Sequence, residues 1–245
     1  MSRLKIRLSC LESVDSTNAY CKRLAAQGAP EGTLVIANAQ TGGRGRMGRS
    51  FYSPPGLGVY MSLLLRPDAP ADCVQSLTAF TAVAVCRAIE DTAELSPEIK
   101  WVNDILLDGK KLCGILCESA VGAGGVEYAV VGIGLNVITR TEDFPPELRD
   151  TAGSLYSQSG KIVERGRLIS VLTAELDRAY DAWCGDKTAY LDDYRRRCPM
   201  VGSYVSVGGK EAVVTGIESD FGLRVRYLGG GSELLHSGEV SVFGK

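Results

Sequence analysis

The spacing of apolar residues predicts strands and helices along the first half of the chain. Leu4, Ile6 and Leu8 alternate with polar residues, as in a strand with one buried face. Residues 15–18 then offer side chains that cap the N-terminus of a helix. The elements expected up to residue 93 are a strand at 4–8, a helix at 19–26, strands at 33–38 and 59–65, and a long helix at 74–93.

The second half contains a strong hairpin signal and then a change of character. Asp108-Gly109 separates two apolar runs, which predicts two strands joined by a two-residue turn. After Pro199, short alternating runs are separated by glycine-rich turns, as in a small all-β domain. We therefore expect two domains, 1–198 and 199–245. The elements expected before this boundary are strands at 105–107, 111–117 and 127–137 and helices at 165–183 and 188–196.

Composition limits the class of protein. Apolar residues make up 45% of the 245 residues and charged residues 23%, which is typical of a soluble globular protein and not of a disordered one. No apolar run reaches the roughly 20 residues of a membrane span, so we expect no membrane association and a cytoplasmic location. The net charge of −2 provides no broad attraction to nucleic acid, so binding of anions must be local.

Cysteine and histidine usage narrows the chemistry. The eight cysteines show no pattern of zinc ligands, and we expect them to be reduced and structural. His236 is the only histidine, which makes Ser-His and Cys-His nucleophiles improbable. Catalysis, if present, must use other groups.

A loop at residues 42–49, GGRGRMGR, places three arginines among four glycines. Arginine offers bidentate donors for phosphate and carboxylate, and glycine lets a ligand approach the backbone closely. The loop thus suits a polyanionic small molecule, although a mobile solvated loop is the simpler alternative. A dinucleotide-binding GxGxxG is rejected, because Pro54 and Pro55 prevent the helix that must follow, and no GxxxxGK[ST] loop is present.

Three further segments carry candidate chemistry. In KWVND, residues 100–104, a cation, an amide and a carboxylate precede the predicted hairpin, whose second strand begins at Lys111. A lysine there can stabilise developing negative charge, and Asp104 can position a magnesium ion. The alternative is that Lys110 and Lys111 are merely solvated turn residues. Glycines in GIGLN, residues 132–136, permit close approach of a ligand or tight packing alone. Residues 16–18, Ser-Thr-Asn, can cap a helix, bind a ligand, or both.

Taken in order, Ser16-Thr17-Asn18, Gln40 with GGRGRMGRSFYSPPG, KWVNDILLDGKKLCGILCES and GIGLN resemble the biotin–protein ligase family. The resemblance implies an α+β fold in which a mixed β-sheet is flanked by helices. This is the class II synthetase-like catalytic fold of biotin ligases, and a small C-terminal SH3-like β-barrel follows it. Some members carry an N-terminal DNA-binding helix-turn-helix. Because this chain begins almost directly with the catalytic pattern, operator binding is not expected.

The same resemblance implies substrates and residue roles. Biotin would be activated by ATP and Mg²⁺ as biotinyl-5′-adenylate and transferred to a lysine of a biotin carboxyl-carrier protein. The residues that would bind biotin are Ser16, Thr17, Asn18, Gln40, Gly43, Arg44, Gly45, Arg46, Lys111 and Gly114. Those that would bind ATP are Arg46, Arg49, Phe51, Asn103, Asp104, Lys111 and Asn136. Lys111, Arg46 and Asp104 would be catalytic, with Asp104 a direct or indirect metal ligand. Phe51 replaces the family's common tryptophan.

Two other functions are alternatives to biotin ligation. A lipoate or octanoate ligase would want a longer apolar tunnel, and a non-catalytic biotin or biotinyl-adenylate sensor would bind biotin yet release no pyrophosphate. A homodimer formed through a sheet edge would also fit the family. The arginine loop, with four glycines, is expected to be weakly ordered until a ligand binds.

Overall fold

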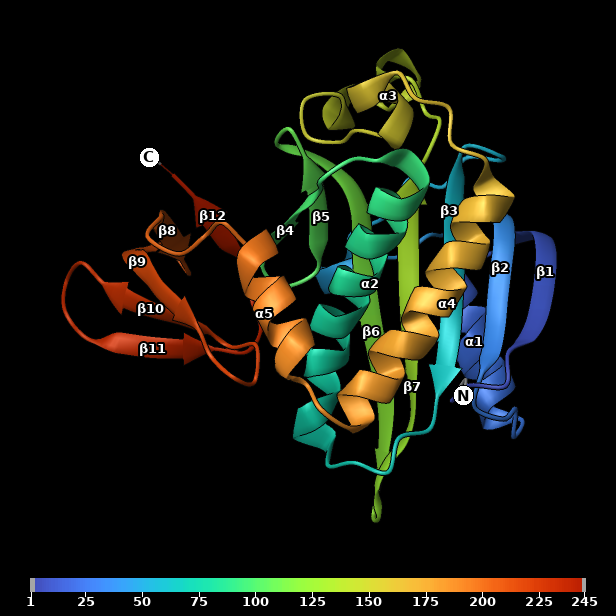
Figure 1. Cartoon of the computed structure of the whole chain (residues 1–245), viewed down its shortest axis with the longest axis horizontal. Coiled ribbons are helices and arrows are strands. Elements are labelled where there is room, and N and C mark those ends of the chain that lie inside the picture. The colour runs from blue at the N-terminus through green and yellow to red at the C-terminus, as the bar shows by residue number, and fades with distance from the viewer. Residues whose placement is uncertain (1–2, 244–245) are drawn as a thin grey trace.

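A computed structural model describes residues 3–243 and confirms the expected α+β class with a mixed sheet flanked by helices (Figure 1). The large sheet has the order β1-β2-β3-β7-β6-β5-β4, in which β1 and β2 are parallel and the other neighbours antiparallel. Its strands are β1 (Arg7–Val14), β2 (Thr33–Gln40), β3 (Gly58–Leu65), β4 (Glu98–Lys100), β5 (Asp104–Leu107), β6 (Lys110–Gly122) and β7 (Gly125–Asn136).

Helices cover the two faces of the large sheet unequally. The long helices α2 (Ser76–Ala93) and α4 (Arg165–Cys184) lie together over one face, and the short α1 (Thr17–Ala26) lies on the other (Figure 1). On the α1 side a small apolar cluster joins Cys21 and Ala25 to Val35, Leu64 and Val130. Helix α1 therefore packs against β2, β3 and β7 on this second face.

Local signals in the sequence account for several elements. Ser16 has extended backbone angles and its Oγ accepts a hydrogen bond from the Ala19 amide, which begins α1 as an N-cap. Asp108 and Gly109 both have positive φ, 49° and 76°, so the β5–β6 turn is of the primed type that the sequence predicts. The predicted long helices agree with the structure within two residues at each end.

The N-terminal strand was predicted in the wrong place. β1 begins at Arg7, Ile6 and Leu8 are exposed, and Leu4 is buried outside any strand. β1 is an edge strand with a mostly exposed surface, so its register follows pairing with β2 and not an apolar stripe. The sequence also missed β4 and the segment after β7, which contains short 3₁₀ turns at Thr141–Asp143 and Pro146–Leu148 and helix α3 (Leu155–Ser159).

After helix α5 (Thr188–Arg197), five strands form a second sheet in the order β11-β10-β9-β8-β12. They are β8 (Tyr204–Val207), β9 (Lys210–Ile217), β10 (Leu223–Tyr227), β11 (Ser232–Leu235) and β12 (Val240–Val242). The core continues from one sheet to the other: Phe221 packs against Phe80 and Tyr194, and its carbonyl accepts from Trp101 Nε1 at 2.9 Å. The division into two domains and the SH3-like assignment remain predictions.

Two compositional expectations can be compared with the structure. One segment of the described residues, Ala71–Ala93, is long and apolar enough to cross a membrane, which the sequence did not lead us to expect. However, 72% of its most apolar stretch is buried inside the protein, as in a core helix. All eight cysteines lie among the described residues and are free thiols, as expected. Burial raises the pKa of Cys21 and that of Cys117 to about 12, which keeps these thiols protonated and unreactive.

Candidate functional site

A cavity of about 390 Å³ lies beside the start of α1 and against strands β5, β6 and β7 of the large sheet. Successive residues of a strand point to opposite faces, so Cys113 and Leu135 pack into the core beneath α2 while their neighbours face the cavity. Those neighbours include Gly114 on β6, paired with Gly134 on β7. The two central strands therefore carry paired glycines on the side of the cavity.

The glycines on this side of the two strands make room for side chains. A Cβ at Gly134 would lie 2.6 Å from the Phe51 ring, and one at Gly132 would overlap the Asn18 side chain. Phe51 thus rests directly on the sheet beside Gly114. Of the two explanations for GIGLN, close packing accounts for both glycines, and it fixes the positions of two residues that line the cavity.

One end of the cavity is neutral and hydrogen-bonded. Ser16, Thr17 and Asn18 are almost wholly buried at the start of α1 and also line the cavity, so capping and a position at the site coexist. Gln40 Oε1 accepts from the Thr17 amide at 2.8 Å, and Gln40 Nε2 donates to Ser53 Oγ at 2.9 Å. These contacts set which end of the Gln40 amide faces Thr17.

Behind this end lies Glu118, to which the sequence analysis assigned no role. Glu118 accepts hydrogen bonds from Asn18 Nδ2 at 2.9 Å and from Lys22 Nζ at 2.5 Å. Burial acts to raise the pKa of Glu118, but hydrogen bonds from Lys22 and Asn18 and the charges of Lys22 and Arg44 outweigh it, so this pKa lies below its ordinary value. A carboxylate beside the neutral end is thus kept ionised.

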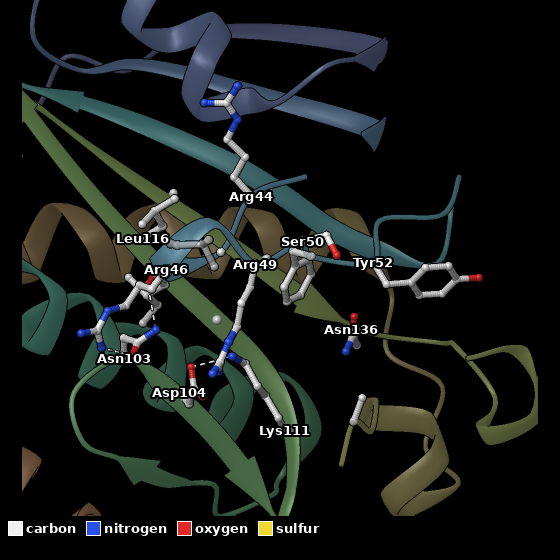
Figure 2. Close-up of a pocket in the computed structure, with 18 of the residues that line it drawn as sticks. Arg44, Arg46, Arg49, Ser50, Tyr52, Asn103, Asp104, Lys111, Leu116 and Asn136 are labelled. Atoms are coloured by element: carbon white, nitrogen blue, oxygen red, sulfur yellow. Dashed lines mark hydrogen bonds and ion pairs between the residues drawn. The ribbon is translucent and has the colours of Figure 1, made fainter. Parts of the chain in front are cut away.

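The other end carries cations. Lys111 Nζ lies 2.7 Å from Asp104 Oδ1, and Lys100 also lines the cavity. Arg46 Nη1 donates to Asn103 Oδ1 at 2.7 Å. Figure 2 shows Arg46, Arg49 and Lys111 around this end, with Arg44 pointing away from them. The hairpin and the arginine loop therefore meet here, as the motifs suggested.

The arginine loop folds as a compact turn. Arg44 and Ser50 form an antiparallel bridge around a 3₁₀ turn, Arg46–Gly48, and the chain then runs extended toward β3. No helix follows, in agreement with the rejected dinucleotide-binding pattern. Gly43 lies within the loop, where a Cβ would come within 2.5 Å of the Phe51 carbonyl and 2.7 Å of Ser53 Oγ.

The second sheet contributes a wall that the sequence analysis missed. Glu239 Oε1 lies 2.6 Å from Arg49 Nη2, and the Gly238 carbonyl accepts from Arg46 Nη2 at 3.1 Å. Both partners of the Arg49–Glu239 pair are well exposed, at 69% and 47%. Nothing in the local sequence around Gly238 marks these residues, because they reach the site only through the packing of the two sheets.

The segment after β7 forms the remaining wall. Asn136 Nδ2 donates to the Gly153 carbonyl at 3.0 Å, while its buried Oδ1 has no hydrogen-bond partner among residues 3–243. Asn136 therefore lies beside the cavity with one buried acceptor unused. The lining residues from this segment, which the sequence analysis also missed, are Phe144, Leu148, Thr151 and Ala152.

The structure brings the predicted site residues together around this one cavity. Its lining includes Ser16, Thr17, Asn18, Gln40, Arg44, Gly45, Arg46, Arg49, Phe51, Asn103, Asp104, Lys111, Gly114 and Asn136. Gly43, the remaining predicted residue, lies within the loop and packs against Phe51 and Ser53. Their individual roles remain predictions.

Two acidic side chains lie at the cationic end, Asp104 beside Lys111 and Glu239 beside Arg49. Among the described residues no group of three His, Cys, Asp or Glu side chains could hold a metal ion. A single carboxylate suits a magnesium ion that is bound mainly by substrate phosphates and water. Asp104 therefore fits as one carboxylate ligand of a magnesium ion whose other ligands are phosphates and water.

Comparisons with known proteins agree with the motifs. Residues 10–136 match the model of the biotin/lipoate A/B protein ligase family. The biotin--[acetyl-CoA-carboxylase] ligase of Mycobacterium tuberculosis is 32% identical over 245 residues, covering 96% of this chain and 88% of that protein. The bifunctional ligase/repressor BirA of Bacillus spizizenii is 44% identical over 167 residues, which cover 68% of this chain. The chain spans about half, 51%, of the length of that relative.

A solved structure extends the similarity over the whole chain. The biotin protein ligase from Aquifex aeolicus in complex with biotin and ATP is 28% identical, with a TM-score of 0.82 and coverage of 98% of this chain and 99% of that one. The match includes the second sheet as well as the large one, because so little of either chain is left out. By motif, fold and overall similarity, this chain belongs to the biotin/lipoate A/B protein ligase family.

Proposed function

We propose that this protein activates biotin with ATP as biotinyl-5′-adenylate and transfers the biotinyl group to a lysine of a biotin carboxyl-carrier protein. The observation that carries the proposal is the single cavity with a neutral hydrogen-bonding end and a cationic end. Biotin joins a neutral ureido ring to a carboxylate, and ATP adds phosphates, so the two ends match the two kinds of group. The relatives named as biotin ligases support the same assignment.

In the first step a carboxylate oxygen of biotin attacks the α-phosphorus of ATP. A new O–P bond forms, the bond to the bridging oxygen breaks, and pyrophosphate leaves with that oxygen. Lys111 and Arg46 stabilise the negative charge that develops on the phosphoryl oxygens. Asp104, 2.7 Å from Lys111 Nζ, holds this ammonium in place. Magnesium bound with the phosphates would neutralise charge, and Asp104 is the carboxylate that would hold it, directly or through water.

In the second step the neutral amine of the carrier lysine attacks the acyl carbon of the adenylate. The amide bond forms, AMP leaves, and no covalent enzyme intermediate is required. Orientation of the two reactants supplies much of the rate enhancement. The arginine loop, with Arg44 and Arg46, retains the adenylate and keeps water from it until the carrier arrives.

The nucleotide side of the cavity is proposed from the resemblance to the family, and the geometry supports it. Phe51, lying on Gly134, offers an aromatic face to adenine, and Asn136 lines the same cavity. Arg49 and Asn103 lie at the phosphate end. A cytoplasmic location and a homodimer formed through a sheet edge belong to this proposal, the first as an expectation from composition and the second as one from the family.

The test is biotin-dependent release of pyrophosphate from ATP and magnesium, followed by transfer of biotin to a carboxyl-carrier domain. The proposal requires release and transfer with biotin and much less of either with lipoate or octanoate. Biotin binding without pyrophosphate release would support the sensor alternative and contradict the proposal. Preference for lipoate over biotin would instead assign the chain to the acyl-ligase branch of the family.

A further inference from the structure

Hydrogen bonds behind the neutral end form one continuous chain. Lys22 Nζ bonds to Glu118, whose other oxygen accepts from Asn18 Nδ2 at 2.9 Å. Asn18 Oδ1 lies 2.6 Å from Ser62 Oγ, and Ser62 Oγ lies 2.8 Å from Thr17 Oγ1. Ser62 is fully buried on β3, where it pairs with Gly132. The chain thus leads from a charged pair at its partly exposed end to Thr17, which lines the cavity.

At the Glu118 end of this chain, groups that can only accept hydrogen bonds fix which atom donates in each of the following bonds. The Leu116 carbonyl and the Glu118 carboxylate can only accept, so the NH₂ group of Asn18 must face them. Its Oδ1 then faces Ser62 and can only accept as well. The single hydroxyl proton of Ser62 is therefore committed to Asn18.

The same logic applies to Thr17. Its hydroxyl has two protein neighbours, Ser62 Oγ at 2.8 Å and Gln40 Oε1 at 3.2 Å. Ser62 has no proton left to give, and Gln40 presents its oxygen because that atom accepts from the Thr17 amide. Either neighbour takes the Thr17 proton. Only lone pairs of Thr17 remain for a ligand in the cavity.

We propose that Glu118, held by Lys22, is a positioning residue that acts through Asn18 and Ser62 to make Thr17 an obligatory acceptor for an N–H group of the substrate. The inference rests on the proposed function, since the ureido ring of biotin has two such N–H groups. Lipoate and octanoate have no such N–H group. The hydrogen-bond chain from Lys22 and Glu118 through Asn18 and Ser62 to Thr17, here called the relay, therefore selects against them. Each bond in the chain polarises the next one, which strengthens the final contact to the ligand.

The first test is Glu118→Gln, which keeps the shape of the side chain and removes its charge. We expect the Kd for biotin, measured by calorimetry without ATP, to rise roughly tenfold, because hydrogen bonds to a charged group are about twice as strong as neutral ones. The KM for ATP should stay unchanged. A matched control is Glu218→Gln, which makes the same change in an ion pair with Arg224 on the second sheet and should leave both constants unaltered.

A second measurement tests the direction of the protons. The probes are the two isomeric carbamate analogues of biotin, each with a ring oxygen in place of one ureido N–H. The unaltered protein should reject strongly the isomer that places oxygen lone pairs against Thr17, and Glu118→Gln should reject it less. The Kd effect of Glu118→Gln should also shrink in a Thr17→Val background, because the relay then has no end to act on.

Several outcomes would overturn the inference. They are an unchanged biotin Kd in Glu118→Gln, equal losses for biotin and both carbamates, or effects that simply add to those of Thr17→Val. Thermal unfolding of the variants identifies a general loss of structure, in which biotin and ATP binding fall together, and this too contradicts the relay. Biotin-dependent pyrophosphate release by the unaltered protein, together with an unchanged biotin Kd in Glu118→Gln, would refute the relay alone, whereas a protein that binds no biotin would refute both proposals.

Discussion

The two ends of the cavity are built in different ways. At the neutral end Thr17 is 4% exposed and Ser62 is fully buried, and both are held by hydrogen bonds to other parts of the protein. At the cationic end Arg49 is 69% exposed and is held by an ion pair with Glu239 from the second sheet. One end is therefore preorganised, and the other is assembled from exposed contacts.

The difference follows from the kind of ligand group that each end must bind. A neutral ring is recognised only by donors and acceptors at fixed positions, and unsatisfied buried groups penalise any wrong partner. Anionic phosphates attract cations over a longer range, so exposed arginines can close on them after binding. Exposed ion pairs contribute about 0 to 1 kcal/mol, which leaves the arginine loop easy to displace.

The largest effect is expected at the cationic end, from Lys111→Ala. Removing a donor that stabilises transition-state charge should lower the rate of biotin-dependent pyrophosphate release roughly 100- to 1,000-fold. Lys110→Ala is the matched control, since Lys110 donates to the Asp150 carbonyl at 2.6 Å and does not line the cavity. Equal losses in the two variants would contradict the assignment of Lys111.

The next largest effect concerns the glycines between the two ends. Gly134→Ala would place a Cβ 2.6 Å from the Phe51 ring, so the ring must move from the position in which it faces adenine. Overpacking of this size costs about 1 to 3 kcal/mol, and we expect the KM for ATP to rise roughly tenfold or more while biotin affinity changes little. Gly216→Ala, on β9 with nothing within 4 Å of the new Cβ, is the control. An unchanged KM for ATP would remove Phe51 from the nucleotide site.

A smaller effect should appear in the pH dependence of ligand affinity at the neutral end of the cavity. Lys22 from α1 and Arg44 from the loop face Glu118, and the pKa of this carboxyl lies below its ordinary value. Its contribution to ligand affinity is therefore complete above the ordinary carboxyl pKa of roughly 4.3 and is lost as the pH falls through the lowered pKa. The measurement uses biotin methyl ester, which has no carboxyl group of its own. Glu118→Gln should lack this component, and an identical pH profile in both proteins would exclude Glu118 as its source.

The smallest effect is expected from Glu239→Gln, which removes the exposed ion pair with Arg49. It should change the KM for ATP by less than about fivefold and less still at high salt.

Hydrogen exchange should show the backbone amides of residues 44–49 exchanging rapidly in the free protein and slowly with biotinyl-adenylate bound. Strong protection in the free protein would contradict a loop that orders on binding and would make the two ends alike.

Local chemistry in the sequence was sufficient for much of the fold. The Asp108-Gly109 turn, the cap at Ser16 and the long apolar helix were predictable because each depends on neighbouring residues and their backbone preferences. The edge strand β1 was misplaced, since few of its side chains are buried and its register depends on a partner strand. The motif residues were found for a similar reason: their types and order are visible without knowing where they meet.

Contacts between distant parts of the chain could be seen only in the tertiary structure. Arg46 meets Gly238 across 192 residues of sequence, and Asn18 meets Glu118 across 100. Neither pairing follows from propensity or spacing, because it depends on the register of β6 against β7 and on the packing of the two sheets. The sequence by itself identified the motif residues that line the cavity, and it did not mark Glu118, Gly238 or Glu239. The tertiary structure decided which of the motif residues are held rigidly, because only burial and long-range hydrogen bonds can fix a side chain before its ligand arrives.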